Sequence, residues 1–327
     1  MEKKEYTLEE VKIKASEFLE RKRKRNETTY LNYRTSINYF IYYLTDIVKI
    51  DVLGTENNET ILEGFQGSLY EGFTYKCGES ERIVKVKASG VNTHIRRIKT
   101  FLNSIGLKIE KVKQLSVNKP KYKSLKPEEI KLLIKECPNK WSNKEIAVRN
   151  STLIQFLFNT AFRINEALTI TTDKFYFEDG SYYVEIYEKG KAKDKTTPIA
   201  ISTNTGNLLE QYLKIKSVPS DYIFSSINPS KDGKAKPLSR ENFNSSIRDL
   251  AAYVDLKHNT NISSIVKNNS SHVFRHSKLS YLLRVKKEDV VTVQKIARHS
   301  SINSTLIYLN PEEEAINKVR VENDILI

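Results

Sequence analysis

Cysteine is scarce in this 327-residue chain, and its two cysteines, Cys77 and Cys137, form no C-x-x-C pattern and no metal-ligand spacing with histidine. This argues against a disulfide framework and a zinc site, and it favours a reducing cytoplasm. No apolar run approaches the length of about 18 residues that a membrane-spanning helix needs. The first ten residues also lack the apolar core of a signal peptide. We therefore expect a cytoplasmic protein with no membrane partner.

Acidic residues are outnumbered: 40 Asp and Glu stand against 54 Lys and Arg, a formal net charge of +14. The excess is present in both halves of the chain, so it is not a basic tail on a neutral domain. Such a distribution predicts a polyanionic partner that contacts both halves. The hydrophobic content of 39%, with 18 Tyr and 13 Phe, is too high for a disordered chain. The length suggests about two domains.

Helical periodicity dominates the first part of the chain. Apolar residues recur at helical spacing over 8–19, 30–44, 61–73 and 91–102. This predicts a four-helix N-terminal domain over residues 1–111, followed by a lysine-rich linker over 112–123 and a second domain over 124–327. Basic residues in two predicted helices are our candidates for contact with this polyanion: Arg96, Arg97, Lys99, Arg240 and Arg248.

The second domain mixes helices with a short stretch of strands. A helix is expected to start at Pro127, and a longer one covers 146–168. Residues 183–187 and 196–201 favour two strands joined by a turn, and Pro198 would place the second strand at a sheet edge. Helices are then predicted over 206–216, 239–253, 271–284 and 287–297. The pattern predicts a mainly α domain with a small antiparallel β-sheet.

Five residue positions in this second domain suggest phosphate chemistry. Ser271 is a plausible N-cap, which would put His272 and Arg275 one turn apart on one helix face. Arg163 lies near the end of the 146–168 helix, where Glu166 either orients it or makes a surface pair. His299 stands nine residues before Tyr308. Arginines and imidazoles gathered around a phosphate would activate a tyrosine, an ordinarily weak nucleophile, and stabilise a pentacoordinate phosphorane.

The order and spacing of four sequence boxes carry a family resemblance. TAFRINEAL, YEKGKAKDKTTPI, HVFRHSKLSYLL and VQKIARHSSINSTLIYLN follow one another in residues 124–310. They resemble the first-arginine box, the lysine-bearing β-hairpin, the HxxRH box and the final tyrosine box of the tyrosine recombinases, the phage-integrase and Xer-type family. The N-terminal half is similar only in pattern, as a helical core-binding domain that would complete a clamp around DNA.

The resemblance implies a role for each of these residues. Arg163 and Arg275 would bind the non-bridging oxygens of the scissile phosphate, and His299 would hydrogen-bond the same phosphate. His272 would act in proton transfer near the nucleophile. Tyr308 would be the nucleophile, forming a 3′-phosphotyrosyl bond, and a hairpin lysine would protonate the leaving 5′ oxygen. Because phosphotyrosyl exchange conserves bond energy, neither a metal nor any other cofactor is expected.

Two departures from the family pattern affect this reading. The hairpin lysine is Lys189 when counted from the preceding strand and Lys191 when counted back from Pro198; the first is slightly favoured. The family usually has Leu-Gly before the last histidine, whereas this chain has Ala297-Arg298. Arg298 would adopt a left-handed helix end at a cost of about 1 kcal/mol, or the helix would end differently. We expect its side chain to be an exposed charge, with a phosphate contact as the alternative.

The resemblance also implies partners: double-stranded DNA with a specific core site, a homotetramer on paired sites, and room for accessory factors. A C-terminal helix from Pro311 would dock on a neighbouring protomer or fold back on its own domain. The first helical stripe starts near Thr7, which favours a recombinase without an arm-binding domain, either a mobile-element integrase or a Xer-type resolvase. The alternatives are a type IB topoisomerase-like enzyme and a catalytically silent DNA-binding protein of the same fold.

Overall fold

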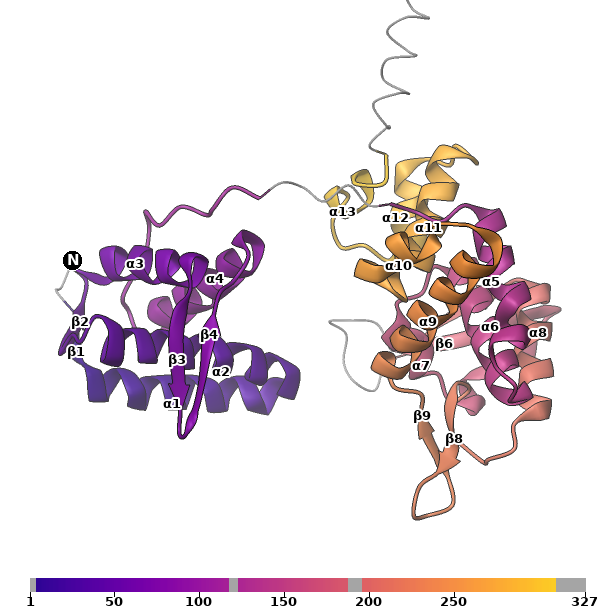
Figure 1. Ribbon diagram of the computed structural model, residues 1–327, viewed down its shortest axis with the longest axis horizontal. Helices are drawn as coiled ribbons and strands as arrows, with labels where there is room; N and C mark the ends of the chain where they lie inside the picture. The colour runs from indigo at the N-terminus through magenta and orange to yellow at the C-terminus, as the bar shows by residue number, and fades with distance from the viewer. Residues whose placement is uncertain (1–3, 118–122, 188–195, 310–327) are drawn as a thin grey trace, which may run out of the picture. The chain divides into compact units, whose positions relative to one another are not determined.

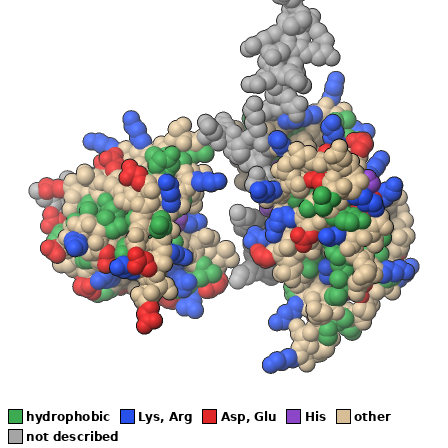
Figure 2. Space-filling model, viewed as in Figure 1, with side chains coloured by type: hydrophobic (Ala, Val, Ile, Leu, Met, Phe, Trp, Pro, Cys, Tyr) green, Lys and Arg blue, Asp and Glu red, His purple; other side chains and the backbone are tan. Residues whose placement is uncertain are grey.

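The computed structural model describes residues 4–117, 123–187 and 196–309, apart from the side chains of 268 and 269. The chain divides into two compact units, Met1–Pro120 and Lys121–Ile327, each with its own hydrophobic core (Figure 1). Lys and Arg side chains occur on the visible face of both units (Figure 2). Within the described ranges, no helix combines the length and apolar character needed to cross a membrane.

The first unit contains the four predicted helices together with two short antiparallel strand pairs. Its elements are β1 (Glu5–Thr7), α1 (Leu8–Arg25), α2 (Glu27–Tyr42), the π-helical turn η1 (Tyr43–Ile47), β2 (Val52–Gly54), α3 (Asn58–Glu71), β3 (Phe73–Cys77), β4 (Ser80–Val84) and α4 (Ala88–Ser104). Strand β1 pairs with β2, and β3 pairs with β4, both antiparallel. The two strand pairs were not predicted from the sequence.

Local capping explains where the first helices start. Thr7 and Glu10 form a reciprocal capping box at the start of α1, in which Thr7 Oγ1 accepts from the Glu10 amide at 3.3 Å. Asn26 separates α1 from α2, and its Oδ1 accepts from the Thr29 amide at 3.0 Å. Behind these caps the apolar faces of all four helices meet around buried aromatic residues such as Phe40 and Phe101.

The segment after α4 is attached to the first unit. Val112 is buried in the core of that unit. Asn92 both donates to the carbonyl of Leu115 and accepts from its amide, at 2.9 and 2.8 Å. Lys99 donates to the Val112 carbonyl at 3.2 Å. Residues 112–115, at the start of the predicted linker, are therefore fixed to the N-terminal unit by hydrogen bonds between α4 side chains and their backbone.

The second unit is mainly helical. Its elements are α5 (Pro127–Lys140), α6 (Lys144–Thr160), α7 (Ile164–Leu168), the 3₁₀ turn η2 (Thr172–Lys174), β5 (Phe175–Glu178), β6 (Ser181–Tyr187), β7 (Thr196–Ile201), α8 (Thr203–Ile215), β8 (Ser225–Pro229), β9 (Ala235–Pro237), α9 (Arg240–His258), α10 (Ile262–Asn269), α11 (His272–Arg284), α12 (Val290–Ala297) and α13 (Asn303–Leu306). The predicted mainly α fold with a small antiparallel sheet is confirmed.

The sheet of this unit has the order β5-β6-β7. Central strand β6 alternates buried and half-buried residues, as a strand covered on one face does. Pro198 lies on β7 opposite Glu185, so the predicted edge position of this proline is confirmed. The turn between β6 and β7, which carries Lys189 and Lys191, lies outside the described residues, as does the predicted C-terminal helix from Pro311.

The helix predicted over 146–168 is wrong in one respect that matters for the site. Helix α6 ends at Thr160, and Ala161 adopts a left-handed conformation with φ 54° and ψ 26°. A new short helix, α7, starts at Ile164 with Arg163 as its N-cap residue. Arg163 therefore does not lie near the end of a long helix but at a sharp bend between two helices. No proline or glycine marks this bend in the sequence.

Candidate active site

The start of helix α11 places His272 and Arg275 as the sequence suggested, with Ser271 at the N-cap position but without a side-chain cap. Ser271 has helical backbone angles and its side chain makes no capping hydrogen bond. Instead, its amide donates to Oδ1 of Asn244 in α9 at 3.0 Å, and the preceding Ser270 has a positive φ of 25°. The start of the helix is therefore fixed by a tertiary contact with α9.

Arg275 is the buried centre of the site, with 4% of its surface exposed. Its guanidinium donates short hydrogen bonds from Nη1 to the carbonyl of Ala161 and from Nη2 to the carbonyl of Ala297. Both carbonyls stand at helix ends, at the last turns of α6 and α12, where backbone acceptors lack helical partners. Burial, together with the nearby charge of Arg163, lowers the pKa of Arg275 to about 10. It therefore stays charged at neutral pH.

Glu166 connects Arg163 to the rest of the site. Its Oε1 accepts from Arg163 Nη1 and its Oε2 from the Arg163 amide, both at 2.8 Å. Glu166 is 8% exposed, which settles the question left open by the sequence: this is not a surface pair. The side chain of Arg163 is 32% exposed, so part of its guanidinium still faces solvent. Salt bridges and hydrogen bonds lower the pKa of Glu166 although burial opposes this.

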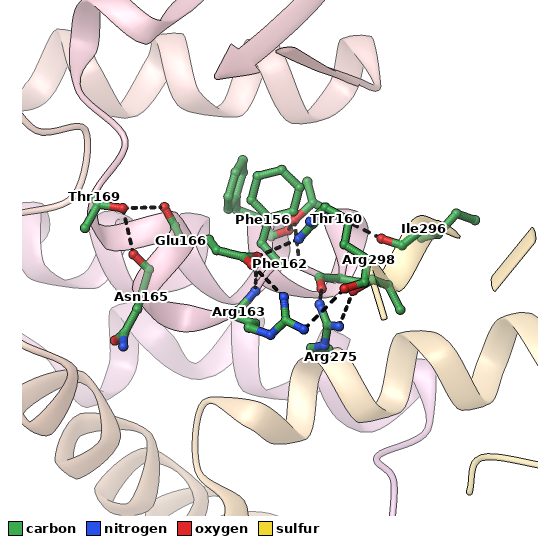
Figure 3. A network of polar contacts seen from close by, with 12 residues as sticks. Phe156, Thr160, Phe162, Arg163, Asn165, Glu166, Thr169, Arg275, Ile296 and Arg298 are labelled. Atoms are coloured by element: carbon green, nitrogen blue, oxygen red, sulfur yellow. Dashed lines mark hydrogen bonds and ion pairs between the residues drawn. The ribbon is translucent and has the colours of Figure 1, made fainter. Parts of the chain in front are cut away.

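Arg298 adopts the left-handed conformation, with φ 52° and ψ 47°, and ends helix α12. Its Nη2 lies 2.6 Å from Glu166 Oε2, and its guanidinium lies 4.4 Å from the ring centre of Phe162. The side chain is 13% exposed, so the predicted exposed charge is wrong. The structure shows the reason: a buried carboxylate and an aromatic face both lie within its reach (Figure 3).

Three consecutive carbonyls at the end of α12 accept hydrogen bonds from three different guanidinium groups. Ile296 accepts from Arg298 at 3.3 Å, Ala297 accepts from Arg275, and Arg298 accepts from Arg163 at 3.5 Å. The helix dipole makes this end of α12 partly negative, which favours cations there. Figure 3 shows these groups converging from α6, α7, α11 and α12.

Tyr308 lies beside two histidines. Its hydroxyl is 2.6 Å from Nδ1 of His276, and its ring stacks nearly parallel to that of His299 at 6.3 Å between centroids. The residue is 3% exposed. Arg284 of α11 donates from Nε to the Tyr308 carbonyl at 3.0 Å. The tyrosine is therefore held against α11 at both its hydroxyl and its backbone.

The three histidines of the site are biased toward their neutral forms. Burial lowers the pKa of His276 to about 4, with contributions from His272 and Arg275. Burial and the charge of Arg275 likewise lower the pKa of His299 to about 4. The pKa of His272 is lowered by desolvation and then by Arg275, although its ring is exposed. At neutral pH the positive charge of the site therefore belongs to its arginines.

His299 is oriented by its neighbours in sequence. Its Nδ1 lies 2.9 Å from Oγ1 of Thr305, and its amide donates to the Gln294 carbonyl at 3.1 Å. Gln294 Nε2 donates in return to the carbonyl of His299 at 3.1 Å. Thr305 and Gln294 therefore fix His299 after the left-handed turn at Arg298, where Arg275 is near enough to lower its pKa.

The remaining candidates have varied surroundings. Lys189 and Lys191 lie outside the described residues. The candidates for DNA contact are placed as follows: Arg240 is exposed beside Glu241, Arg248 donates to Ser270, Arg96 is exposed, Arg97 donates to the Asn32 carbonyl, and Lys99 to that of Val112.

Sequence reasoning missed one residue and misjudged two. His276 received no role, although its position four residues after His272 places it on the same helix face. Glu166 was left between two interpretations, and Arg298 was expected at the surface. The sequence held part of the signal for the Glu166–Arg298 ion pair. An arginine in place of the family's usual glycine adds a charge, and a buried charge needs a partner that neutralises it.

The chain matches the model of the phage integrase family over residues 123–315, more than half of its length. The tyrosine recombinase XerH of Helicobacter pylori is 25% identical over 226 residues, which cover 67% of this chain and 57% of XerH. The tyrosine recombinase XerC of Rickettsia bellii is 24% identical over 318 residues, 92% of each chain. The match thus spans little more than half of XerH but nearly all of XerC.

Solved structures show the same fold. XerH bound to its difH substrate in a pre-cleavage complex superposes with a TM-score of 0.60 at 20% identity, covering 88% of this chain and 78% of XerH. The Tn1549 transposon integrase in complex with transposon right end DNA gives a TM-score of 0.66 at 13% identity, covering 98% and 99%. With the family match and the recombinase relatives, this chain belongs to the phage integrase family, the DNA breaking and rejoining tyrosine recombinases.

Proposed function

We propose that this recombinase cleaves one DNA strand by attack of the Tyr308 phenol oxygen on a phosphodiester. The O–P bond that forms is a 3′-phosphotyrosyl linkage, and the P–O5′ bond breaks. The observation that supports this is the gathering of Tyr308, Arg163 and Arg275 with three histidines around the end of α12.

The arginines supply the charge that this step requires. A pentacoordinate phosphorane carries more negative charge on its non-bridging oxygens than the diester does, so fixed guanidinium groups stabilise it selectively. Arg275 is already held in place by two carbonyls, and Arg163 by Glu166. Binding of the phosphate therefore needs little reorganisation of either side chain.

Proton transfers complete the reaction. His272 is the proposed acceptor of the phenol proton, as the family resemblance implies, although the base nearest the phenol oxygen in this structure is His276, whose Nδ1 lies 2.6 Å away. Lys189 or Lys191 is the proposed donor to the leaving 5′ oxygen. Religation reverses both transfers when a 5′ hydroxyl attacks the phosphotyrosyl bond. Tyr308 is almost fully buried, so the reaction also requires the tyrosine to move toward the phosphate when DNA binds.

The partners follow from the relatives whose structures contain DNA. We propose that both units contact double-stranded DNA as a clamp on a specific core site, and that the working complex is a homotetramer on two sites. Recombination serves either the integration and excision of a mobile element or Xer-type resolution; the relatives include both Xer recombinases and a transposon integrase. Terminal repeats and cargo beside the gene would indicate an integrase.

A nicked suicide substrate tests the chemistry. A duplex selected from a random library for tight binding is nicked near each candidate cleavage position, so that the 5′ end diffuses away after attack. The wild-type protein is expected to form a denaturant-stable adduct, and Tyr308→Phe is expected to bind DNA without forming one. Tyr281→Phe, a tyrosine of α11 that contacts Phe158, is the matched control and should react normally.

The outcomes distinguish the alternatives. A wild-type protein that binds tightly but never traps DNA would be the silent DNA-binding protein. An adduct that persists in Tyr308→Phe would contradict the assignment of the nucleophile. Relaxation of supercoiled DNA without exchange between two sites would identify the topoisomerase-like enzyme.

A further inference from the structure

A cavity in the N-terminal unit is not explained by the chemistry described so far. It has a volume of about 330 Å³ and lies between helix α2 and the β3–β4 hairpin. Helix α2 contributes Arg34, Asn38 and Tyr39 to its wall, and the hairpin contributes Tyr75, Cys77 and Arg82. The lining is thus cationic, polar and aromatic, and it contains no carboxylate.

The register of the hairpin explains this composition. Tyr75 pairs with Arg82, and Cys77 with Ser80. Because side chains alternate along a strand, these residues share one face, and Lys76 and Glu81 share the other. Lys76 and Glu81 form an ion pair of 3.7 Å there. The hairpin therefore keeps the acidic side chain of Glu81 away from the cavity.

Aromatic rings hold the two arginines of the cavity. Arg82 donates from Nη2 to the hydroxyl of Tyr39 at 2.8 Å, and its guanidinium lies 5.7 and 5.6 Å from the rings of Tyr39 and Tyr75. Arg34 lies 5.4 Å from the ring of Tyr30. Among the described residues, neither guanidinium has a carboxylate within 4.0 Å. Two positive charges thus face one cavity, and no carboxylate in the part of the chain that the structure describes neutralises them.

Helix α4, which carries a predicted DNA contact, packs against α2 beside one wall residue of the cavity, Tyr39. Arg97 of α4 donates to the carbonyl of Asn32 and to Ser36, both on α2. His94 of α4 lies 2.9 Å from Ser36 Oγ and 5.7 Å, between ring centroids, from Tyr39. A strand of DNA that follows the α2–α4 surface would therefore reach the cavity at Tyr39.

We propose that this cavity holds a phosphate group of the DNA backbone, bound by Arg34 and Arg82. Guanidinium groups present paired N–H donors that match phosphate oxygens, and the Asn38 amide can add a further donor. The proposal rests on the proposed function, because it takes DNA as the partner. A free nucleotide offers the same phosphate chemistry, so the test must separate the two sources.

Cys77 provides a natural reporter inside the cavity. It is exposed, whereas the chain's other cysteine, Cys137, is buried. Modification by an uncharged maleimide therefore reports on Cys77. With the selected duplex at ten times its Kd, the modification is expected to slow about tenfold, because only the free fraction of the protein reacts. Adenosine monophosphate alone is expected to give no protection.

A variant with both arginines removed tests the charge contribution. Arg34→Gln with Arg82→Gln is expected to reduce the slope of log K against log salt by about 0.9, the value for one phosphate contact, and to lose the protection of Cys77. Lys76→Gln is the matched control, since it removes a charge from the opposite face of the same hairpin. Its slope for DNA binding and its protection should equal those of the wild type. The circular dichroism spectrum checks that each variant is folded.

Three outcomes would overturn the proposal. DNA bound to saturation with Cys77 reacting at the rate of the free protein would show that the cavity is empty in the complex. An unchanged salt slope in the folded double variant would show that no phosphate is lost. Protection by adenosine monophosphate but not by DNA would assign the cavity to a free nucleotide. If the wild-type protein bound no DNA in the titration that measures its Kd, the proposed function itself would be wrong.

Discussion

Replacing Glu166 by glutamine should destabilise the C-terminal unit strongly. The carboxylate is shared by Arg163 and Arg298, and its 8% exposure leaves little water to replace it. Glutamine has the same shape and keeps one acceptor oxygen, so the perturbation is chiefly the loss of one negative charge. Two cations would then remain beside each other, with a third, Arg275, nearby.

The size of the loss in free energy of unfolding depends on which charge is left without a partner. Arg298 is only 13% exposed and its partner within salt-bridge distance is Glu166. Removing one member of a buried ion pair costs about 3–5 kcal/mol, because the other charge stays desolvated. Arg163 contributes less, since 32% of its side chain remains in contact with solvent. We therefore expect Glu166→Gln to lower the free energy of unfolding by about 3 kcal/mol or more.

Urea unfolding, followed by circular dichroism, measures this difference. Glu241→Gln serves as the matched control, because Glu241 pairs with Arg240 at 2.9 Å but both side chains are at least half exposed. Its effect should stay below about 0.5 kcal/mol, as for other surface pairs. The contrast compares a buried carboxylate shared by two arginines with an exposed carboxylate that pairs with one.

A double-mutant cycle with Arg298→Met decides whether the pair is coupled. If Arg298 is the charge that Glu166 neutralises, the double variant should lose about 2 kcal/mol less than the sum of the two single variants. Methionine retains an apolar side chain against Phe162, so most of the packing there is preserved. Additivity within about 0.5 kcal/mol would refute the reasoning, because independent sites add and coupled ones do not.

Three further outcomes are expected from the site. Because the pKa of His276 is lowered to about 4, the unfolded chain binds its proton first as pH falls below about 6.5, so stability should decline from there to pH 4. His276→Gln should make this decline smaller in urea titrations, while the lowered pKa values of His299 and His94 keep the rest of it. Arg275→Lys keeps a charge but cannot span two carbonyls, so adduct formation should fall by orders of magnitude with little change in DNA affinity. A 5′-bridging phosphorothiolate substrate should rescue only one of Lys189→Ala and Lys191→Ala, which identifies the general acid.

Much of the architecture was predictable because it depends on local signals. The four N-terminal helices follow from apolar spacing, and Pro198 marked an edge strand. The strand pairs β1–β2 and β3–β4 were missed because each strand is short, from three to five residues. No turn joins β1 to β2, which are separated by α1, α2 and η1. A strand of that length shows too few alternations to stand out against a helical pattern.

The errors at the site have a common physical origin. Ala161 and Arg298 both adopt left-handed backbone conformations, which cost a non-glycine residue about 1 kcal/mol. Sequence rules assign such positions to glycine or asparagine. Here the two bends direct the carbonyls of Ala161 and Ala297 onto Arg275. Bonds to a charged donor contribute about 1.5–3 kcal/mol, enough to offset the local strain. The compensation is tertiary, so no local pattern predicts it.

The same arrangement predicts different behaviour for Arg275 and Arg163, the two arginines proposed to bind the phosphate. A guanidinium has five N–H donors in a fixed plane, and Arg275 uses Nη1 and Nη2 to reach two helix-end carbonyls. Its position is therefore set by the backbone of α6 and α12, with donors remaining for a phosphate. Arg163 is more exposed, and its contact with the Arg298 carbonyl is long at 3.5 Å. We expect Arg275 to keep its place when DNA binds and Arg163 to adjust to the phosphate, which a structure of the DNA complex would show directly.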